Sequence, residues 1–332
     1  MKSKIRFGII GCSSIAIKSA IPSIIDGKFS TLEMIGSRDI KKSKKIAKKF
    51  SCLEYGSYDQ VLKNNNIDAV YISLPIKLHE KWICRAAKAG KHVLCEKSAV
   101  LSENSARKVI QVCKDNNVRI MENFVFKFHP QHKKIFELIE KKSIGKIHTI
   151  DAKFGFNIKY NKNNFRFSKK LGGGALNDIG TYLISTSKFI YKEVPHSIFC
   201  NLEIDKKTKI DTRGNILLSF SNNKSALLSF GYNNYFQSTY NIWGTKGMIK
   251  SERAFNVNKN METEISIYQN DKIKKLKLAP KNQFQIAVDK FCSEIQNGIN
   301  KINFEQDLLE QAIILDAVKR SAKKKSQIRI KI

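Results

Sequence analysis

The stretch that decides the fold lies near the amino terminus and reads Ile5-Arg6-Phe7-Gly8-Ile9-Ile10-Gly11-Cys12-Ser13-Ser14-Ile15-Ala16. Its first half is a short apolar run typical of a buried strand, and its second half is a turn that leads into a helical pattern. A dinucleotide-binding fingerprint lies in this context. Aligning Gly11 with the first fingerprint glycine places Ser13 at the second and Ala16 at the third. The alternative is an ordinary tight strand-to-helix turn.

The amino end of the helix after this turn offers backbone N–H groups to an anion. Serine at position 13 is small and can donate its hydroxyl, so the departure from glycine still permits a pyrophosphate to approach. We therefore expect Gly11, Ser13, Ser14 and Ile15 to contact a bound dinucleotide.

The first ~120 residues alternate short β-type runs with longer amphipathic runs, which predicts a doubly wound parallel sheet of the Rossmann type. We predict strands at 5–10, 32–36, 68–74, 91–95 and 118–121, and helices at 14–26, 40–50, 57–65, 78–89 and 102–116. Ligands of such sheets bind at the carboxyl ends of the strands. The first turn, Ser37-Arg38, Ser73-Pro75 and Glu96-Lys97 all fall at these ends.

After about residue 122 the pattern changes to long β-type runs, which predicts an α+β domain with a large, mostly antiparallel open sheet. The first helix of this part begins at His129-Pro130 and ends near Gly145. We predict strands at 146–157, 196–204, 215–220, 225–232, 238–243, 247–251, 264–269 and 273–278, and helices at 173–191, 282–297 and 305–323. The fold class is α/β, with domains at 1–122 and 123–332.

The composition limits the partners. Sixty basic and 29 acidic residues give a net charge of +31, but the lysines are spread along the chain, as on a solvated surface, so we expect no nucleic-acid partner. No apolar run is long enough to cross a membrane, and no signal peptide is visible, so we expect a cytoplasmic protein. Seven scattered cysteines form no metal-ligand spacing, and His129 and His132 lack a third ligand, so we expect no metal.

The end of the second strand indicates which dinucleotide binds. A carboxylate there would indicate the bare ribose of NAD, whereas this chain has Ser37 and Arg38, with Lys42 close behind. A hydroxyl and a guanidinium suit a 2′-phosphate, so we predict that NADP(H) is preferred and NAD(H) is possible. In the alternative, Asp39 binds the ribose, although Asp39 is better explained as the cap of the helix that starts near residue 40.

A second group of residues that can take part in acid/base chemistry follows Leu171-Gly172-Gly173-Gly174. Asp178 and Tyr182 are four residues apart, which places a carboxylate and a phenol on one face of a helix. Together with the amine of Lys97 they suggest proton transfer. The alternative is a buried ion pair beside a core tyrosine.

These residues, with Cys95-Glu96-Lys97, Met121-Glu122-Asn123-Phe124 and the run from Leu171 to Tyr182, make the chain resemble the glucose-fructose oxidoreductase, inositol dehydrogenase and MocA (Gfo/Idh/MocA) family. The resemblance covers nearly the full length. The segment 128–132 and the triple glycine look most similar to the branch with NDP-hexose 3-ketoreductases and dimeric dihydrodiol dehydrogenases.

The resemblance implies roles for individual residues. Lys97 takes the position of a catalytic lysine beside the nicotinamide and the substrate, and Tyr182 and Asp178 take those of the catalytic Tyr or His and its preceding acid. Ser98 stands where the family usually has proline. The implied cofactor contacts are Leu74, Pro75, His79, Glu96, Lys97 and Asn123, and the implied substrate contacts include Lys97, Asn123, Asp178 and Tyr182.

The chemistry of these residues is that of ketone reduction, in which Tyr182 donates a proton and Lys97 stabilises charge on oxygen. Asp178 orients the group or relays the proton. Arg166 lies in a basic loop that suits the diphosphate of a sugar nucleotide.

We therefore expect an NADP(H)-dependent oxidoreductase acting on a carbonyl or hydroxyl carbon of a sugar, most plausibly a nucleotide-sugar ketoreductase that forms a homodimer or homotetramer through its open sheet. Two alternatives stay open. One is a dehydrogenase of a free sugar, inositol or trans-dihydrodiol, and the other is a catalytically silent NADP-binding regulator or a basic nucleic-acid-binding protein.

Overall fold

The structure, a computed structural model, describes residues 3–298 and 302–330. The chain forms two compact units. Unit 1 comprises Met1–Val125 and Phe284–Leu309, and unit 2 comprises Phe126–Gln283 and Glu310–Ile332. Each unit is described by itself below.

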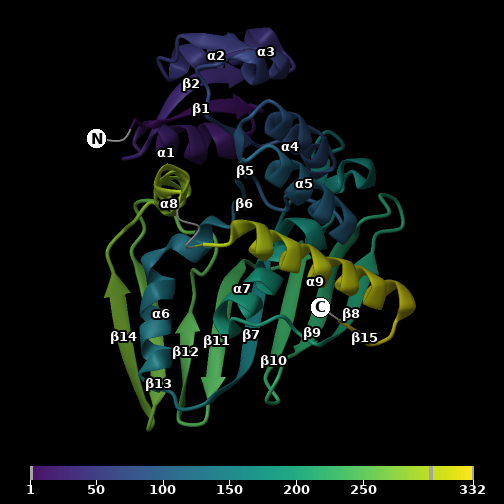
Figure 1. The fold of residues 1–332 in the computed structure, drawn as a ribbon. Helices are drawn as coiled ribbons and strands as arrows, with labels where there is room; N and C mark the ends of the chain where they lie inside the picture. The colour runs from purple at the N-terminus through teal and green to yellow at the C-terminus, as the bar shows by residue number, and fades with distance from the viewer. Residues whose placement is uncertain (1–2, 299–301, 331–332) are drawn as a thin grey trace. The chain divides into compact units, whose positions relative to one another are not determined.

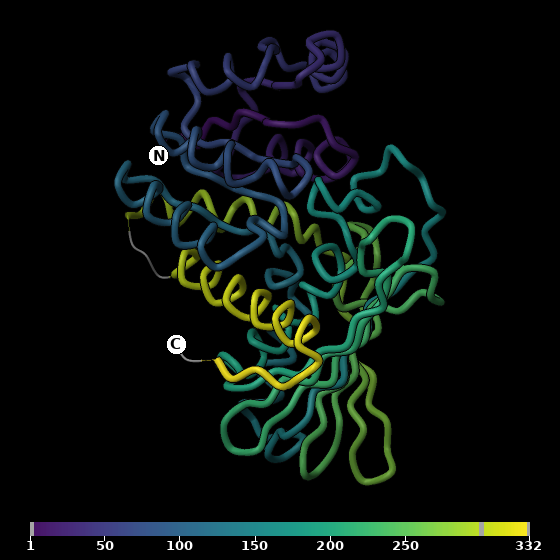
Figure 2. Tube along the Cα trace, turned by 90° about the vertical axis from the view of Figure 1, so that its right-hand side faces the viewer, coloured from purple at the N-terminus to yellow at the C-terminus, as the bar shows by residue number. Residues whose placement is uncertain are grey.

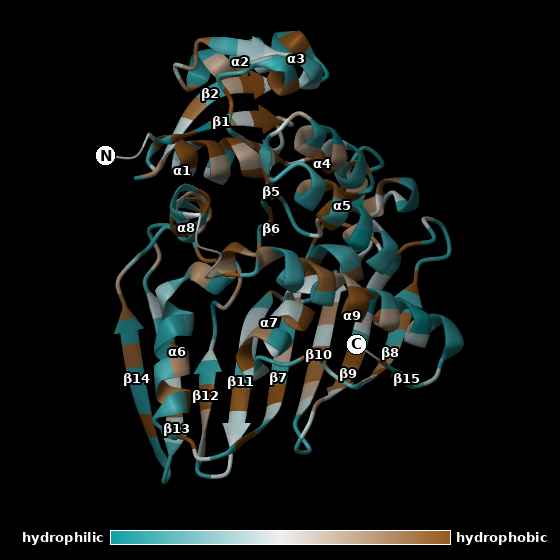
Figure 3. Cartoon of the chain, viewed as in Figure 1, coloured by the Kyte–Doolittle hydropathy of each residue, from teal (hydrophilic) through white to brown (hydrophobic). Residues whose placement is uncertain are grey.

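Unit 1 is built around a six-stranded parallel sheet in the order β3-β2-β1-β4-β5-β6 (Figure 1). This is the strand order of a Rossmann fold. The strands are β1 (Ile5–Ile10), β2 (Ser30–Gly36), β3 (Glu54–Gly56), β4 (Ala69–Ile72), β5 (His92–Cys95) and β6 (Ile120–Glu122). Figure 3 shows apolar residues along β1, and five of its six residues are buried, as expected of a central strand covered on both faces.

The helices of unit 1 connect these strands. They are a π-helical turn (Ala16–Ala20), α1 (Ile21–Ile25), α2 (Ile40–Lys49), α3 (Tyr58–Lys63), α4 (His79–Lys88) and α5 (Glu103–Asp115). Side-chain caps define several starts, because a helix leaves its first N–H groups without backbone partners. The Asp39 carboxylate accepts from the Lys42 N–H, which confirms the predicted role of Asp39 as a cap. Ser57 and Gln60 form a capping box at α3.

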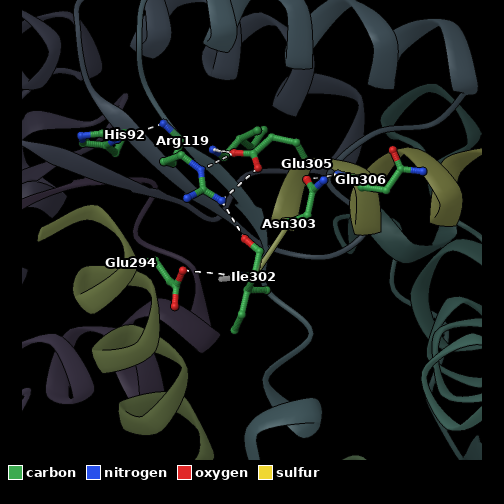
Figure 4. A network of polar contacts seen from close by, with 8 residues as sticks. His92, Arg119, Glu294, Ile302, Asn303, Glu305 and Gln306 are labelled. Atoms are coloured by element: carbon green, nitrogen blue, oxygen red, sulfur yellow. Dashed lines mark hydrogen bonds and ion pairs between the residues drawn. The ribbon is translucent and has the colours of Figure 1, made fainter. Parts of the chain in front are cut away.

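Part of the chain that follows the second sheet in sequence belongs to unit 1. This part, residues 284–309, includes most of α8 (Gln283–Asn297) and the start of α9 (Phe304–Lys324). Figure 4 shows the polar network at this attachment. The Arg119 guanidinium donates to both carboxylate oxygens of Glu305, at 2.8 and 3.0 Å, and to the carbonyl of Ile302 at 2.9 Å. The attachment therefore depends on a bidentate Arg–carboxylate pair, whose two parallel hydrogen bonds fix the relative orientation of the two side chains.

Unit 2 is built around a nine-stranded sheet in the order β14-β13-β12-β11-β7-β10-β9-β8-β15. Among the described strand pairs of this sheet, β10–β7 is parallel and the others are antiparallel. The strands are β7 (Ile147–Phe156), β8 (Ser197–Ile204), β9 (Asp211–Ser219), β10 (Ser225–Tyr232), β11 (Gln237–Gly244), β12 (Gly247–Ser251), β13 (Thr263–Gln269), β14 (Lys272–Leu278) and β15 (Ile328–Arg329). In Figure 2 the chain reverses after α9, so that β15 reaches β8.

Two helices, α6 (Pro130–Glu140) and α7 (Thr181–Tyr191), lie on one face of this sheet (Figure 1). A group of aromatic rings fills the space beneath them. Tyr182 packs with its ring centroid 5.3 to 5.8 Å from those of Phe126, Phe154 and Phe255. The helix that carries Tyr182 is therefore anchored by its aromatic contacts to the sheet.

The predicted α/β class with a parallel sheet and a mostly antiparallel sheet is confirmed. The sequence prediction missed β3 and β15, which have three and two residues. The helix that begins at His129-Pro130 ends at Glu140 rather than near Gly145, and a turn fills the interval.

Candidate active site

The last paired residues of five strands form one row at the carboxyl edge of the unit 1 sheet. The register pairs Gly36 with Ile10, Ile10 with Ile72, Ile72 with Cys95, and Cys95 with Glu122. The next residue of each strand leaves the sheet at this edge. These next residues are Ser37, Gly11, Ser73, Glu96 and Asn123. The sheet therefore brings the predicted cofactor residues of unit 1 to a single edge, where ligands of such folds bind.

The turn after β1 has the backbone that the fingerprint requires. Gly11 has φ +109°, and a Cβ there would lie 2.9 Å from Leu74 Cδ2 and 3.0 Å from the Ser73 carbonyl oxygen. A side chain at position 11 is therefore excluded both by conformation and by contact. The Ser13 hydroxyl accepts from the Ala16 N–H at 3.2 Å and begins the helix. Ser14 and Ile15, in its first turn, are exposed.

The turn after β2 places the predicted 2′-phosphate residues on the surface. Arg38 and Lys42 are exposed, whereas Ser37 is buried, and its hydroxyl accepts from the Asp39 N–H at 3.2 Å. Burial raises the pKa of Tyr58, and the neighbouring Arg38 opposes that rise. Burial likewise raises the pKa of Cys12 against the opposing charge of Lys42. Two cations therefore lie within electrostatic reach of groups next to the dinucleotide turn.

The turn after β5 contains Lys97, which is half-buried, and a cis peptide bond joins Lys97 to Ser98. The preceding Glu96 carboxylate accepts from the Tyr71 hydroxyl at 2.7 Å and from the Asn123 amide at 2.8 Å. Burial raises the pKa of Glu96, and these two hydrogen bonds oppose the rise. The carboxylate of Glu122 accepts from the Ala99 N–H at 2.8 Å.

The turn after β4 contains Leu74 and Pro75, and α4 begins with His79. The His79 ring lies between the carbonyl oxygens of Leu74 and Ser98. The turns after β4 and β5 are thus connected through one buried imidazole.

These residues fit a dinucleotide. The amide oxygen of Asn123 is buried and accepts no hydrogen bond from the residues that the structure describes. A buried acceptor without a partner costs about 1 to 3 kcal/mol, and a ligand N–H group would relieve that cost. The glycine turn, the helix start and the surface cations supply the remaining features that a phosphorylated dinucleotide requires.

In unit 2, Asp178 forms an ion pair with Arg166. The Arg166 Nε donates to Asp178 Oδ2 at 2.6 Å, and Nη2 donates to Oδ1 at 3.3 Å. The Tyr232 hydroxyl also donates to Oδ2, at 3.2 Å. Burial lowers the pKa of Arg166, but the Asp178 carboxylate outweighs burial and holds that pKa above its ordinary value. Asp178 is therefore held by two side chains from outside its own helix.

The triple glycine explains how the Arg166 loop approaches the helix that bears Asp178. A Cβ on Gly173 would lie 2.4 Å from the carbonyl oxygens of Phe165 and Arg166. The Gly174 N–H donates to the Arg166 carbonyl at 3.0 Å. The Asp211 carboxylate accepts from the Leu176 N–H at 2.5 Å and caps the helix start. Glycine is required here because two backbones touch.

The helix before Tyr182 begins with a π-helical turn (Leu176–Gly180), in which the Thr181 N–H donates to the Leu176 carbonyl. A second π-helical turn lies at Ala16–Ala20, directly after the dinucleotide turn. Such turns are rare and are frequent at functional sites. Both occur in the segments that the sequence predicts to be functional.

The structure thus forms two groups from the predicted site residues. One group, at the sheet edge of unit 1, contains the cofactor residues and Lys97, and the other, in unit 2, contains Arg166, Asp178 and Tyr182. Sequence reasoning missed the residues that hold them, which are Tyr71, Glu122, Asp211 and Tyr232. Glu122 follows a predicted strand and could have been found there, whereas Asp211 and Tyr232 have no local signal.

The two histidines near the start of α6 have packing roles. His129 caps the helix by accepting from the Gln131 N–H, and the His132 ring contacts the Tyr240 hydroxyl at 2.8 Å and the Ala254 carbonyl at 3.2 Å. Within the described ranges, no three His, Cys, Asp or Glu side chains are grouped as a metal site requires. None of the described helices has both the length and the apolar composition to cross a membrane.

Comparison with known proteins identifies a family. Residues 5–124 match the sequence model described as "Oxidoreductase family, NAD-binding Rossmann fold", and residues 132–250 match the "GFO/IDH/MocA C-terminal domain". The chain is 30% identical over 319 residues to dTDP-3,4-didehydro-2,6-dideoxy-alpha-D-glucose 3-reductase of Actinomadura kijaniata, with 96% of each protein covered. It is 31% identical to trans-1,2-dihydrobenzene-1,2-diol dehydrogenase of Xenopus tropicalis, over 65% of each protein.

Among solved structures, the chain is similar to a 3-ketoreductase from Actinomadura kijaniata in complex with NADP and TDP-benzene. The TM-score is 0.92 at 29% identity, covering 96% of this chain and 98% of that one. Solved structures of that ketoreductase also include one variant with a tyrosine replaced by phenylalanine and one with a lysine replaced by alanine.

Proposed function

From the premise that the chain belongs to the Gfo/Idh/MocA family of NAD(P)-dependent oxidoreductases, we propose that it is an NADP(H)-dependent ketoreductase of nucleotide-linked sugars. The observation that supports this proposal best is the row at the sheet edge of unit 1. In this row Glu96, which directly precedes Lys97, is next to Asn123 with its buried, unpartnered oxygen, and the turn after β4 lies between Glu96 and the glycine turn. A hydride donor and a reactive amine would therefore share one edge.

In the proposed carbonyl reduction, the predicted site residues have different roles. NADP(H), when bound, supplies or accepts the hydride. Gly11, Ser13, Ser14 and Ile15 would hold the pyrophosphate, and Leu74, Pro75, Glu96 and Asn123 would hold the rest of the cofactor. His79, predicted from the sequence as a cofactor contact, is buried behind them against the Leu74 and Ser98 carbonyls. Tyr182 donates a proton to the developing alkoxide, and Lys97 stabilises developing charge on oxygen.

Asp178 acts as an orienting group rather than as a proton relay. Its two carboxylate oxygens accept hydrogen bonds from Arg166 and Tyr232, and its side chain is 4% exposed. A carboxylate held in this way is suited to fixing the position of its neighbours on the helix. Arg166 keeps about a third of its side chain exposed, at 32%, and could also contact a diphosphate of the substrate.

The reductase activity can be tested with purified protein, NADPH and a panel of substrates that contains nucleotide-linked keto-sugars, free sugars, inositol and a trans-dihydrodiol. We expect turnover with a nucleotide-linked keto-sugar. Tyr182→Phe should lower kcat by about 10²- to 10⁴-fold while NADPH binding, followed by fluorescence, is retained. Binding of NADPH without turnover of any panel member would favour the silent regulator instead.

The preference for NADP(H) is proposed from Ser37, Arg38 and Lys42. The exposed cations lie next to the dinucleotide turn, and the relative in the solved complex binds NADP. Arg38→Ala should weaken NADPH binding by about 10- to 100-fold, as expected for losing a charged hydrogen bond, and should leave NADH binding unchanged. Lys274→Ala, on the edge strand β14 of unit 2, serves as the control for net charge. A wild-type protein that prefers NADH contradicts this assignment.

We also propose that a second copy of the chain covers the open face of the nine-stranded sheet. The register pairs Phe199 with Leu217 and Leu217 with Leu227, and these side chains are 40 to 48% exposed. Trp243, on a neighbouring part of the sheet, is 59% exposed. Leu217→Asp should convert the dimer or tetramer to monomer in sedimentation experiments. An unchanged sedimentation coefficient would contradict this interface.

All seven cysteines are free, which favours a reducing compartment such as the cytoplasm.

A further inference from the structure

His79 occupies a position between two functional turns. Its Nε2 lies 2.8 Å from the carbonyl oxygen of Leu74, and its Nδ1 lies 2.9 Å from the carbonyl oxygen of Ser98. The residue is 1% exposed, so both contacts are shielded from water. Leu74 follows β4 and Ser98 follows β5, so one ring connects the turns of two adjacent strands.

Groups of unit 1 also hold the backbone on both sides of Lys97. The Glu96 N–H donates to the Ile72 carbonyl at 2.9 Å, and the Ala99 N–H donates to the Glu122 carboxylate at 2.8 Å. Between these contacts, the Ser98 carbonyl is held by His79. Serine does not restrict its own φ as a proline would, so the conformation of this turn depends on its hydrogen bonds.

We propose that His79 is a positioning residue for Lys97. By holding the Ser98 carbonyl against α4, the imidazole sets the backbone from which the Lys97 side chain extends. The inference rests on the proposed function, because it assumes that Lys97 acts on the substrate. A displacement of about 1 Å at a catalytic group can cost about 100-fold in rate.

The alternative is a histidine that only fills space at the start of α4. Two features favour positioning. Both ring nitrogens contact backbone carbonyls, and a residue needed only for its volume would not require two polar contacts in a buried site. In addition, burial lowers the pKa of His79 and the charge of Lys97 adds a smaller effect in the same direction, so the ammonium lies within electrostatic reach of the ring.

The two roles can be separated with three variants. His79→Phe keeps an aromatic ring and removes the ring nitrogens that contact the two carbonyl oxygens, and His79→Gln keeps one amide donor. Ile83→Ala is the matched control, since Ile83 is fully buried in the same helix. The measurements are kcat, KM, NADPH affinity by fluorescence, and the primary isotope effect with deuterated NADPH.

We expect kcat of His79→Phe to fall by about 10- to 100-fold, with KM and NADPH affinity within about threefold of wild type. The isotope effect should rise, because hydride transfer becomes slower than product release. His79→Gln should recover part of the lost kcat. Ile83→Ala should lose thermal stability and keep kcat.

Two results overturn the inference. One is a folded His79→Phe protein with wild-type kcat, and the other is an equal loss of kcat in Ile83→Ala. If His79→Phe does not fold, His79→Leu, which also lacks a polar side-chain atom, replaces it, and wild-type kcat with an unchanged isotope effect in that variant counts against positioning. Lys97→Met distinguishes this failure from that of the proposed function, because a Lys97→Met protein with full turnover would contradict the assigned role of Lys97 itself.

Discussion

The ion pair between Arg166 and Asp178 should dominate the stability of the helix that bears Tyr182. Asp178 is 4% exposed and Arg166 is 32% exposed, and two hydrogen bonds join them. Removing one partner of a buried pair costs about 3 to 5 kcal/mol, because the other charge is left without compensation. Asp178→Asn should therefore cost about 3 kcal/mol, at the lower end, since Arg166 can regain water.

Arg166→Gln should cost more, about 4 kcal/mol, because it leaves a buried carboxylate that keeps the hydrogen bond from Tyr232 and loses the positive charge of Arg166. The double variant removes both charges. Its cost should be smaller than the sum of the two single costs by about 2 kcal/mol, which is the coupling energy of the pair. For a protein of this size, each kcal/mol lowers Tm by about 2 to 4 °C.

The two tryptophans allow each unit to be followed separately. Trp82 lies in unit 1 and Trp243 in unit 2, and the chain contains no others. In a Trp82→Phe background, urea unfolding followed by tryptophan fluorescence reports on unit 2 alone. This matters because a two-unit protein need not unfold in one step.

The exposed pair Arg213–Glu203 in the same unit is the matched control. Its N–O distance is 3.0 Å, and both side chains are 57% exposed. Neutralising either residue should cost less than about 1 kcal/mol, as is usual for surface pairs. Single costs at Arg166 and Asp178 that add to within about 0.5 kcal/mol in the double variant would refute the reasoning.

Two further predictions concern backbone and pH. Gly174→Ala should destabilise unit 2 by more than about 2 kcal/mol, because Gly174 has φ +118° and a Cβ there would clash with the Asp211 carboxylate. Gly90 has φ +71°, and a Cβ there would meet open space. Gly90→Ala should therefore cost only about 1 kcal/mol in unit 1. Equal costs for the two glycines in urea unfolding would disprove the clash. Burial raises the pKa of Glu193, but hydrogen bonds from Lys224 and Ser221 outweigh burial and hold that pKa at about 2. The ionised Glu193 carboxylate therefore stabilises the fold above pH ~4.5, and this stabilisation is lost as the pH falls toward 2. Glu193→Gln should flatten the stability profile between pH ~5 and ~2, and an unchanged slope in acid titrations would show that the ion pair has no such effect.

Strands and helices with clear periodicity could be predicted from the sequence. The strands 5–10, 225–232 and 247–251 match the structure at both ends, and Asp39 caps α2 as predicted. The strand β3 was missed because only three residues pair and two of them are exposed, so no hydrophobic run marks it. The π-helical turns could not be predicted from the sequence either, because the periodicity of such a short turn does not differ detectably from that of an α-helix.

The packing of residues 284–309 on unit 1 illustrates a second limit. The helix pattern of α8 was predicted, but nothing in the local sequence shows which sheet it packs against. The choice depends on pairs separated by more than 180 residues, such as Arg119 with Glu305, and on the ring contact between Phe7 and Phe291. Such pairs are set by tertiary structure and leave no periodic signal.

The two groups of site residues differ in how far sequence order alone determines them. In unit 1, parallel strands all end at one edge, so any polar residue that directly follows a strand must come close to the others. Ser37 and Glu96 could be assigned in this way without knowledge of any contact, whereas Asn123 was implied by the family resemblance. In unit 2, Arg166 reaches Asp178 only because glycines let two backbones touch and because Asp211, thirty-three residues after Asp178 in the printed sequence, caps the helix. The geometry of a site built on strand ends is thus implied by topology, whereas that of a site built on a loop depends on contacts that only the folded chain reveals.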